Sequence, residues 1–317
     1  MKKIVVAAIG GNSLIRNPQN TSVEDQYQSL METCRHLADI VKQNYRLVIC
    51  HGNGPQVGFI LRRSAIAYEH AKMHQVPLSS CVADTQGAIG FQIQTALENQ
   101  LNLKGEALKT ATVVTRVLVD KKDKKILNPS KPIGSFFTPE MTEDLKKRYR
   151  DWIFAEDPSG RGFRRIVASP APARIIEIDP IKNLIKNNYI VIACGGGGIP
   201  VIKKEDGCLK PIDAVLDKDL TSSMLAAEIK AELFIISTDI SHVYINFRKK
   251  QEKPLEHVQL HQIKKYLKEG HFAAGSMMPK IEAAINFIEN GGKKVIITSP
   301  ENLSAGIKNG YGTIITP

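Results

Sequence analysis

The hydrophobic residues of this chain gather in short continuous runs, separated by longer segments in which apolar positions recur at helical spacing. Short, wholly apolar runs are typical of strands buried on both faces of a parallel sheet. Such strands are predicted at residues 3–9, 46–50, 111–119, 189–194, 232–237, 242–247, 294–298 and 312–316.

Between these runs the pattern predicts helices. In residues 22–43, Leu30, Cys34 and Leu37 repeat at helical spacing, and Ser22 is a suitable N-cap. Further helices are predicted at 55–72, 84–101, from Pro180, at about 218–230 and at 276–290. Alternating strands and helices predict an α/β protein with a parallel sheet covered on both faces. Ligands of such sheets bind at the carboxyl ends of the strands.

Residues 120–170 interrupt this alternation. They are polar, rich in Lys, Pro and Gly, and contain the only tryptophan, Trp152. We therefore predict a small lobe or lid inserted into a single domain that spans residues 1–317, and not another layer of the main sheet.

The composition narrows the class of partner. The net charge is +11, but the basic residues are scattered and aromatic residues make up only 6% of the chain, so stacking on nucleic-acid bases is the least favoured reading. An anionic small-molecule substrate is favoured instead.

No apolar stretch approaches the ~20 residues of a membrane helix, and no signal peptide is expected. Five cysteines without a CxxC pair are typical of reduced thiols and predict a cytoplasmic protein.

Two glycine-asparagine turns follow predicted strands. Gly10, Gly11 and Asn12 follow the first strand, and Gly52, Asn53 and Gly54 follow the second and precede a proline-started helix. Glycine lets the backbone approach a ligand and direct N–H groups at an anion, and a helix N-terminus adds a favourable dipole. Plain strand-to-helix turns also use glycine. Two such turns at one edge of a sheet nevertheless favour a shared site for a small anion and a transferring phosphoryl group. The spacing fits neither the dinucleotide fingerprint nor a P-loop.

Two lysines lie where a helix start would prefer an acidic residue. Lys218 stands between Asp217 and Asp219, and Lys280 follows Pro279 in a turn for which Ser276 is the expected N-cap. The aspartates also serve as ordinary caps, and a lysine also occurs as a solvated surface residue. A bound phosphate would explain both lysines, because phosphoryl transfer depends on positioned charge.

Two other patterns carry less weight. His70 and His74 have the spacing of a metal pair on a helix, but no third ligand is apparent, so zinc is disfavoured and no metal ligand is assigned in the protein. The run PSGRGFRR either binds an anion or is a turn followed by a solvated basic strand.

Five blocks together resemble the carbamate kinases of the amino-acid kinase family. They are AIGGNSL, HGNGPQVG, NPSKPIG, AVLDKDL and EGHFAAGSMMPK, and their order and spacing match over nearly the whole chain. The resemblance implies a three-layer α/β/α sandwich with an open, mainly parallel central sheet, a protruding subdomain and a homodimer. It also implies Mg²⁺-assisted, reversible phosphoryl transfer between carbamoyl phosphate and ADP, giving ATP and carbamate, often within arginine catabolism.

The same resemblance implies roles for individual residues. Both glycine-asparagine turns and Asp217 would hold the carbamoyl and phosphoryl groups. Lys131 would reach the site from the lid, Lys218 would bridge the phosphates, and Asp219 would orient the lysines. Lys280 would meet the nucleotide phosphates, and the segment ISTDISHVYI would border the nucleotide through Ser237, Thr238, Asp239 and Val243.

Two departures from the family patterns bear on these roles. Most amino-acid kinases have a lysine on the first strand just before the glycines; VVAAIGG has none, as in carbamate kinases, which supports Lys131 as its substitute. The segment EDPSGRGFRR is one residue longer than the usual pattern, which alters the lid loop.

No activated nucleophile beside a base is apparent, so we expect no covalent intermediate. The alternatives are a family kinase for another small carboxylic acid and a catalytically silent nucleotide-binding relative.

Overall fold

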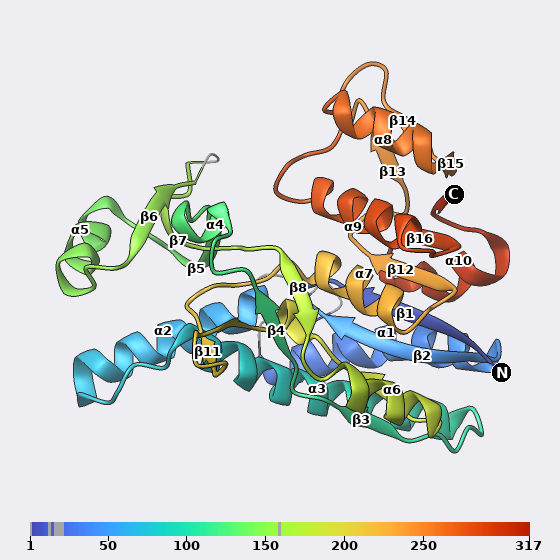
Figure 1. The fold of residues 1–317 in the computed structure, drawn as a ribbon, viewed down its shortest axis with the longest axis horizontal. Helices are drawn as coiled ribbons and strands as arrows, with labels where there is room; N and C mark the ends of the chain where they lie inside the picture. Colours follow the sequence, from blue (N-terminus) through green and yellow to red (C-terminus); the bar gives the residue numbers. More distant parts are fainter. Residues whose placement is uncertain (1, 12–13, 16–21, 158–159) are drawn as a thin grey trace.

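A large, mostly parallel sheet organises the molecule (Figure 1). The structure, a computed structural model, describes residues 2–11, 14–15, 22–157 and 160–317. Eight described strands follow the order β15-β17-β16-β12-β1-β2-β9-β3, and only the β16–β17 pair is antiparallel. They are β1 (Lys3–Ile9), β2 (Tyr45–His51), β3 (Thr110–Thr112), β9 (Ile190–Ile192), β12 (Leu233–Ser237), β15 (His257–Gln259), β16 (Lys294–Thr298) and β17 (Thr313–Thr316). The α/β fold class predicted from the sequence is confirmed.

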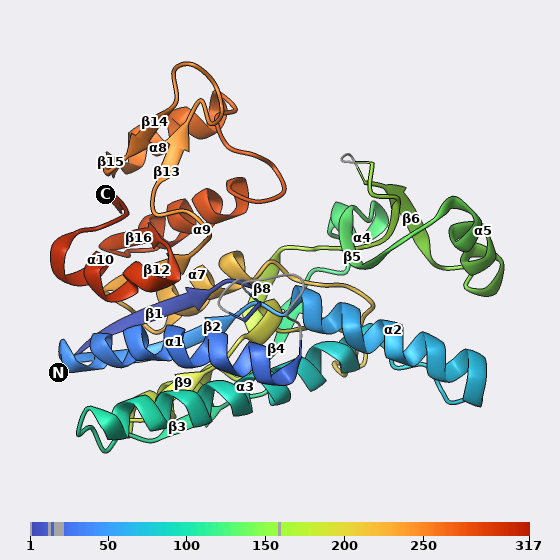
Figure 2. The ribbon, with the colours of Figure 1, turned by 180° about the vertical axis from the view of Figure 1, so that it is seen from behind.

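Helices cover both faces of this sheet, as Figures 1 and 2 show. Side chains alternate along β1, so that Val5 and Ala7 enter one core while Val6 and Ala8 enter the other. The first core is closed by α1 (Val23–Lys42), α3 (Leu78–Leu103) and α10 (Leu303–Asn309). The second is closed by α6 (Ile178–Lys186), α7 (Lys218–Glu228), α8 (Leu260–Lys268) and α9 (Met278–Glu289). Burial on both faces explains why the strands are continuous apolar runs.

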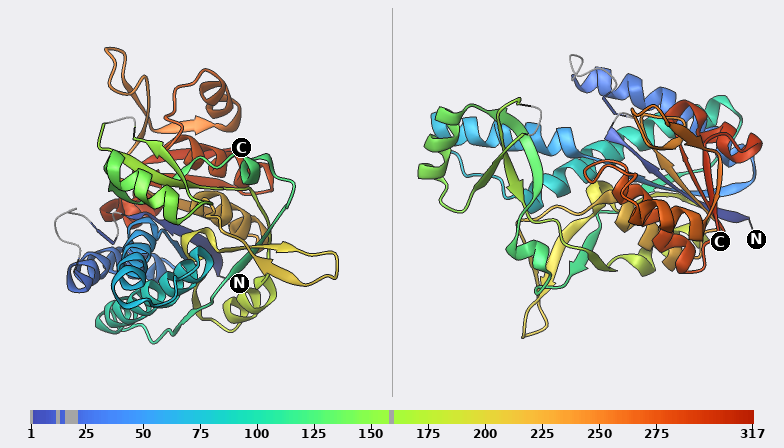
Figure 3. Two further views of the ribbon diagram at one scale, coloured as in Figure 1. Left: turned by 90° about the vertical axis from the view of Figure 1, so that its left-hand side faces the viewer. Right: turned by 90° about the horizontal axis from the view of Figure 1, so that it is seen from above.

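A second sheet leads away from the first toward a protruding lobe. It has the order β11-β10-β4-β8 and consists of β4 (Arg116–Val119), β8 (Pro172–Ile175), β10 (Ile199–Lys203) and β11 (Leu209–Pro211). The protruding lobe, within residues 120–170, contains α4 (Lys124–Leu127), β5 (Lys131–Phe137), α5 (Pro139–Arg148), β6 (Ile153–Glu156) and β7 (Phe163–Val167). Its strands form a separate sheet, β5-β7-β6, which projects beside α2 (Gly54–Ala71), as Figures 1 and 3 show. In the part of the chain that the structure describes, no helix is both long and apolar enough to cross a membrane.

Most predicted elements form, with local differences that have physical causes. Ser22 caps α1 in a capping box with Asp25, as its position suggested. The run 111–119 is not one strand: β3 and β4 belong to different sheets, because the Gln86 side chain binds both the N–H and the C=O of Thr115 and turns the chain. The helix predicted at 84–101 begins earlier, at Leu78, directly after Pro77.

The C-terminal third differs most from the sequence pattern. The run 242–247 does not join the main sheet, since β13 (Val243–Ile245) pairs only with β14 (Lys253–Leu255) among the described strands. Helices α8 and α10 and strands β14 and β15 were not predicted from the sequence. Two short 3₁₀ turns, η2 (Gly195–Gly197) and η3 (Pro300–Asn302), complete the described elements.

Candidate active site

A cavity of about 420 Å³ opens at the carboxyl ends of β1, β2 and β12. Its walls come from the two glycine-asparagine turns, the protruding lobe, and the starts of α2, α7 and α9. The lining residues are 10–11, 52–55, 57, 131–133, 164, 196, 215–219, 237–239, 275–276 and 279–280. Segments from distant parts of the chain therefore share one cavity.

The two glycine turns lie against each other. A methyl group added at Gly52 would be 3.4 Å from the backbone N of Gly11 and 3.6 Å from the Lys218 side chain. One added at Gly10 would be 3.1 Å from the carbonyl oxygen of Ser237. A methyl group at Gly10 would need a small shift of the β12 backbone, whereas one at Gly52 would make ordinary van der Waals contacts with the first turn and with Lys218. Asn12 lies outside the described residues.

Asn53 packs against the glycine-rich turn that follows β9. It is buried, and its Nδ2 donates a 2.8 Å hydrogen bond to the Thr85 hydroxyl, without a side-chain capping bond to α2. Gly196 has a φ of +65°, and a Cβ there would lie 2.1 Å from Asn53 Nδ2. Gly196 lines the cavity, although no sequence motif predicted it as a site residue. Four consecutive glycines were a signal of close approach, but they do not reveal which neighbour approaches.

His51, at the end of β2, supports the second turn. Its Nδ1 lies 2.9 Å from the carbonyl oxygen of Gly52, so that nitrogen must donate and carries the proton. Burial lowers the pKa of His51 to about 4, assisted by nearby Lys218 and opposed by the bond to Gly52. A neutral ring at neutral pH therefore fixes the Gly52–Asn53 peptide.

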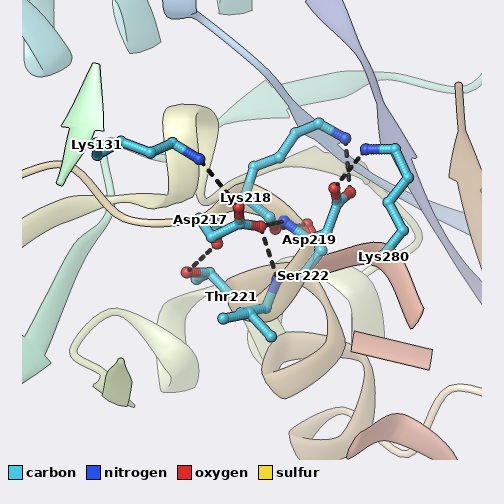
Figure 4. A network of polar contacts seen from close by, with 8 residues as sticks. Lys131, Asp217, Lys218, Asp219, Thr221, Ser222 and Lys280 are labelled. Carbon is cyan, nitrogen blue, oxygen red and sulfur yellow. Dashed lines mark hydrogen bonds and ion pairs between the residues drawn. The ribbon is translucent and has the colours of Figure 1, made fainter. Parts of the chain in front are cut away.

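The start of α7 connects the protruding lobe to the main body (Figure 4). Asp217 is the N-cap: its Oδ1 accepts from the backbone N–H groups of Asp219 (2.9 Å) and Leu220 (3.4 Å). Its Oδ2 lies 3.4 Å from the ammonium group of Lys131, which comes from β5. One carboxylate thus caps the helix and holds a lysine from the lobe.

Asp219 is the most buried charge of the site, with 3% of the residue exposed. Its two oxygens accept from Lys218 (2.7 Å) and from Lys280 of α9 (2.9 Å), and Figure 4 shows both ammonium groups converging on it. Burial alone would raise the pKa of Asp219, but the two lysines outweigh burial and hold it below its usual range. Asp219 is therefore ionised at neutral pH and fixes both lysines.

The remaining candidate residues differ in whether they line the cavity. Ser237, Thr238 and Asp239 line the cavity opposite the lobe, together with Ser276. Ser276 is not the N-cap of α9, contrary to the sequence expectation: the cap position is Met277, and no side chain caps the helix. Val243 does not line the cavity; it is fully buried in the core, and its N–H donates to the Thr313 hydroxyl.

Three paired lysines, two glycine turns and the starts of α2, α7 and α9 surround one cavity, which is the arrangement expected of an α/β protein that binds phosphate-bearing anions. The model of the amino acid kinase family matches residues 3–299. The chain belongs to the amino acid kinase family.

Similar proteins cover almost the entire chain. A carbamate kinase-like protein, YahI, from Escherichia coli is 47% identical over 99% of both chains. A carbamate kinase from Oenococcus oeni is 43% identical over 99% of both. A solved carbamate kinase from Giardia lamblia bound to AMP-PNP superimposes with a TM-score of 0.92 at 38% identity, covering 99% of this chain and 98% of that one.

Proposed function

We propose that this protein is a carbamate kinase, which transfers a phosphoryl group reversibly between carbamoyl phosphate and ADP. The observation that carries the proposal is the position of Lys131, whose ammonium group reaches from the lobe to Asp217 at the centre of the cavity. It compensates for β1, where no lysine precedes Gly10 directly. Full-length similarity to carbamate kinases supports the same function.

The two substrates would occupy opposite sides of the α7 start. Carbamoyl phosphate would lie against Gly10, Gly11, Gly52 and Gly54, with Asn12 and Asn53 among its donors, on the side of Lys131. ADP would lie on the side of Lys280, along Ser237, Thr238 and Asp239. Lys218, between the two sides, would contact the phosphoryl group in transfer. This arrangement leaves no role for Val243 in contacting the nucleotide.

In the direction of ATP formation, a β-phosphate oxygen of ADP attacks the phosphorus of carbamoyl phosphate, and carbamate leaves. Charge on the phosphoryl oxygens is high throughout this loose transition state, so fixed cations stabilise it. The lysines are already oriented by Asp217 and Asp219, so little reorganisation is needed. The reaction needs no covalent intermediate with the protein.

The donor set fits a magnesium ion bound mainly through nucleotide phosphates. No cluster of three or more His, Cys, Asp or Glu side chains suitable for a metal occurs among the described residues. The Asp219 oxygens are occupied by lysines, whereas Asp239 lines the nucleotide side of the cavity. Mg²⁺ commonly binds through one or two carboxylates, substrate phosphates and water. When bound, it would neutralise part of the phosphate charge.

Four further features belong to the same proposal. The protruding lobe acts as a lid that brings Lys131 to the substrate on closure. The protein is a homodimer and supplies ATP at the end of arginine catabolism; the family resemblance supports these features and the lid. It works in the cytoplasm, which the five free cysteines support.

One assay tests the proposed function. ATP formation is measured from ADP and carbamoyl phosphate, with and without Mg²⁺, beside a panel of other acyl phosphates. Mg²⁺-dependent ATP formation with carbamoyl phosphate as the best donor is expected. A different preferred acyl phosphate would identify a family kinase for another acid, and binding without turnover would identify a silent relative.

A further inference from the structure

The basic run in β7 places two neighbouring arginines in different surroundings. Arg165 lies 4.2 Å over the Trp152 ring, and its Nη2 bonds to Asp213 at 2.7 Å. Arg164, on the alternate side of the strand, lines the active-site cavity. Arg165 is thus fixed within the protein, whereas Arg164 faces the space that substrate would occupy.

Among the described residues, Arg164 has no carboxylate partner within ion-pair distance. Its Nη2 donates to the Gly134 carbonyl oxygen at 3.1 Å and its guanidinium lies 5.2 Å from the Phe136 ring centre, but its Nε is buried with no hydrogen-bond partner in this part of the chain. Among the described cations that line the cavity, the three lysines each pair with an aspartate, and Arg164 alone does not.

An arginine in this position costs free energy in the absence of a ligand. Burial lowers the pKa of Arg164; Asp157 partly opposes this shift and Arg161 reinforces it. A desolvated cation with an unsatisfied donor is unfavourable unless an anion supplies both charge and acceptor. Among the described cations that line the cavity, Arg164 is therefore the one best placed to take up an anionic oxygen.

We propose that Arg164 binds carbamoyl phosphate, or carbamate in the reverse direction, through an anionic oxygen. This inference rests on the proposed function. The lobe side of the cavity favours carbamoyl phosphate over the nucleotide: β7 pairs with β5, which carries Lys131, while Lys280 lies across Asp217 and Asp219 (Figure 4). In addition, β5 packs on α2 so tightly that a methyl group on Gly58 would lie 3.1 Å from Gly134 Cα.

The chemistry of the side chain suits this ligand. A guanidinium is planar and offers parallel N–H donors that match the oxygens of a carboxylate or phosphate, and a lysine cannot reproduce that geometry. Since Lys131 and Arg164 belong to the same small sheet, movement of the lobe would bring both cations to the substrate together. Arg164 is therefore a substrate-binding residue that sequence motifs alone left unassigned.

Arg164→Gln and Arg164→Lys test the proposal, with Arg161→Gln as the matched control. Arg161 comes from the same basic run, pairs with Asp157 and does not line the cavity. Loss of one charged hydrogen bond should raise KM for carbamoyl phosphate by about 10- to 100-fold in Arg164→Gln. KM for ADP should change less than about twofold. Arg164→Lys should be intermediate, and Arg161→Gln should match wild type.

Two further readouts separate binding from folding. The melting temperature should not fall in Arg164→Gln, because the substitution removes an unpaired and partly buried cation. The Trp152 fluorescence spectrum should be unchanged, because Trp152 packs on Arg165 and Tyr149. If Arg164→Gln does not fold, the KM values of Arg164→Lys for carbamoyl phosphate and ADP test the proposal instead. A rise in KM for ADP instead, unchanged constants in both Arg164 variants, or an equal effect of Arg161→Gln overturns the proposal. Absence of ATP formation by the wild-type protein refutes the proposed function itself, and is seen before any variant is compared.

Discussion

Replacing Asp219 by Asn should lower kcat without raising KM for either substrate. The substitution keeps the shape of the side chain but removes the charge that holds Lys218 (2.7 Å) and Lys280 (2.9 Å). Asp219 is buried beneath the two lysines, so we assign it a positioning role without substrate contact. Loss of a negative charge makes the cavity more attractive to anions, whereas the lysines lose their fixed orientation.

The structure sets the expected magnitudes. Misplacing catalytic groups by about 1 Å costs on the order of 10²-fold in rate, so kcat should fall by about 10²–10³. KM for ADP and carbamoyl phosphate should stay level or fall. Breaking a buried ion pair costs roughly 3–5 kcal/mol of stability. Because both lysines border an open cavity and can turn toward water, we expect about 1–3 kcal/mol here.

The pH dependence of stability gives an independent check. The pKa of Asp219 lies below its ordinary value of 3.8 in the folded protein, so its ion pairs stabilise the fold above that pH. The stability difference between wild type and Asp219→Asn should therefore be full at neutral pH. It should shrink as the pH falls below about 3.8, where the unfolded wild-type chain takes up the proton, and should be lost once the pH falls through the lowered pKa of the folded protein.

Steady-state kinetics of ATP formation and urea unfolding measure these effects. Asp206→Asn is the control, because Asp206 makes the same kind of ion pair, with Lys204 at 3.0 Å, on an exposed hairpin. Because both partners are exposed to solvent, it should leave the stability and the kinetics essentially unaltered. A wild-type kcat in Asp219→Asn, or a tenfold rise in KM without loss of kcat, would show that Asp219 does not act by orienting the lysines.

The remaining predictions concern the cavity and its support. Lys131→Ala and Lys218→Ala should each lose roughly 10²–10³ in kcat with unchanged circular dichroism, and wild-type rates in either variant would refute its role. His51 remains neutral when folded down to about pH 4 but takes up a proton near pH 6.5 when unfolded. The free energy of unfolding should therefore fall by on the order of 3 kcal/mol between those values. His51→Gln should lack that decline in urea titrations, and an equal decline would assign it to other groups. Gly196→Ala should cost about 1–2 kcal/mol and at least about 10²-fold in kcat, because the new methyl group would displace Asn53; normal kinetics would show that Asn53 tolerates displacement.

Features with local causes could be predicted from the sequence. The buried strands were recognisable as continuous apolar runs, and the Ser22 cap and the glycine turns were visible in a few adjacent residues. The rule that ligands collect at the carboxyl ends of parallel strands then placed Gly10 and Gly52 at one edge. This part of the site needed no knowledge of long-range contacts.

Features that depend on distant parts of the chain could not be predicted from the sequence. The break between β3 and β4 depends on Gln86, which binds Thr115 from 29 positions earlier in the chain. The role of Arg164 depends on which side of β7 faces the cavity, and a basic run does not reveal this. Val243 was assigned because it belongs to a motif next to Asp239, although the chain enters the core before reaching it.

The start of α7 is consistent with the proposal that Lys131 of the lobe takes the place of a lysine on the first strand. Asp217 satisfies helix N–H groups with one oxygen and receives Lys131 with the other, so the cap is formed with or without the lysine. The ion pair with Lys131 is long, at 3.4 Å, and 37% of that side chain is exposed, whereas Lys218 and Lys280 are largely buried at Asp219. The two inner lysines are therefore permanent parts of the site. In the proposed function, Lys131 would exchange Asp217 for a phosphoryl oxygen, and the charge of the cavity would then depend on the position of the lobe.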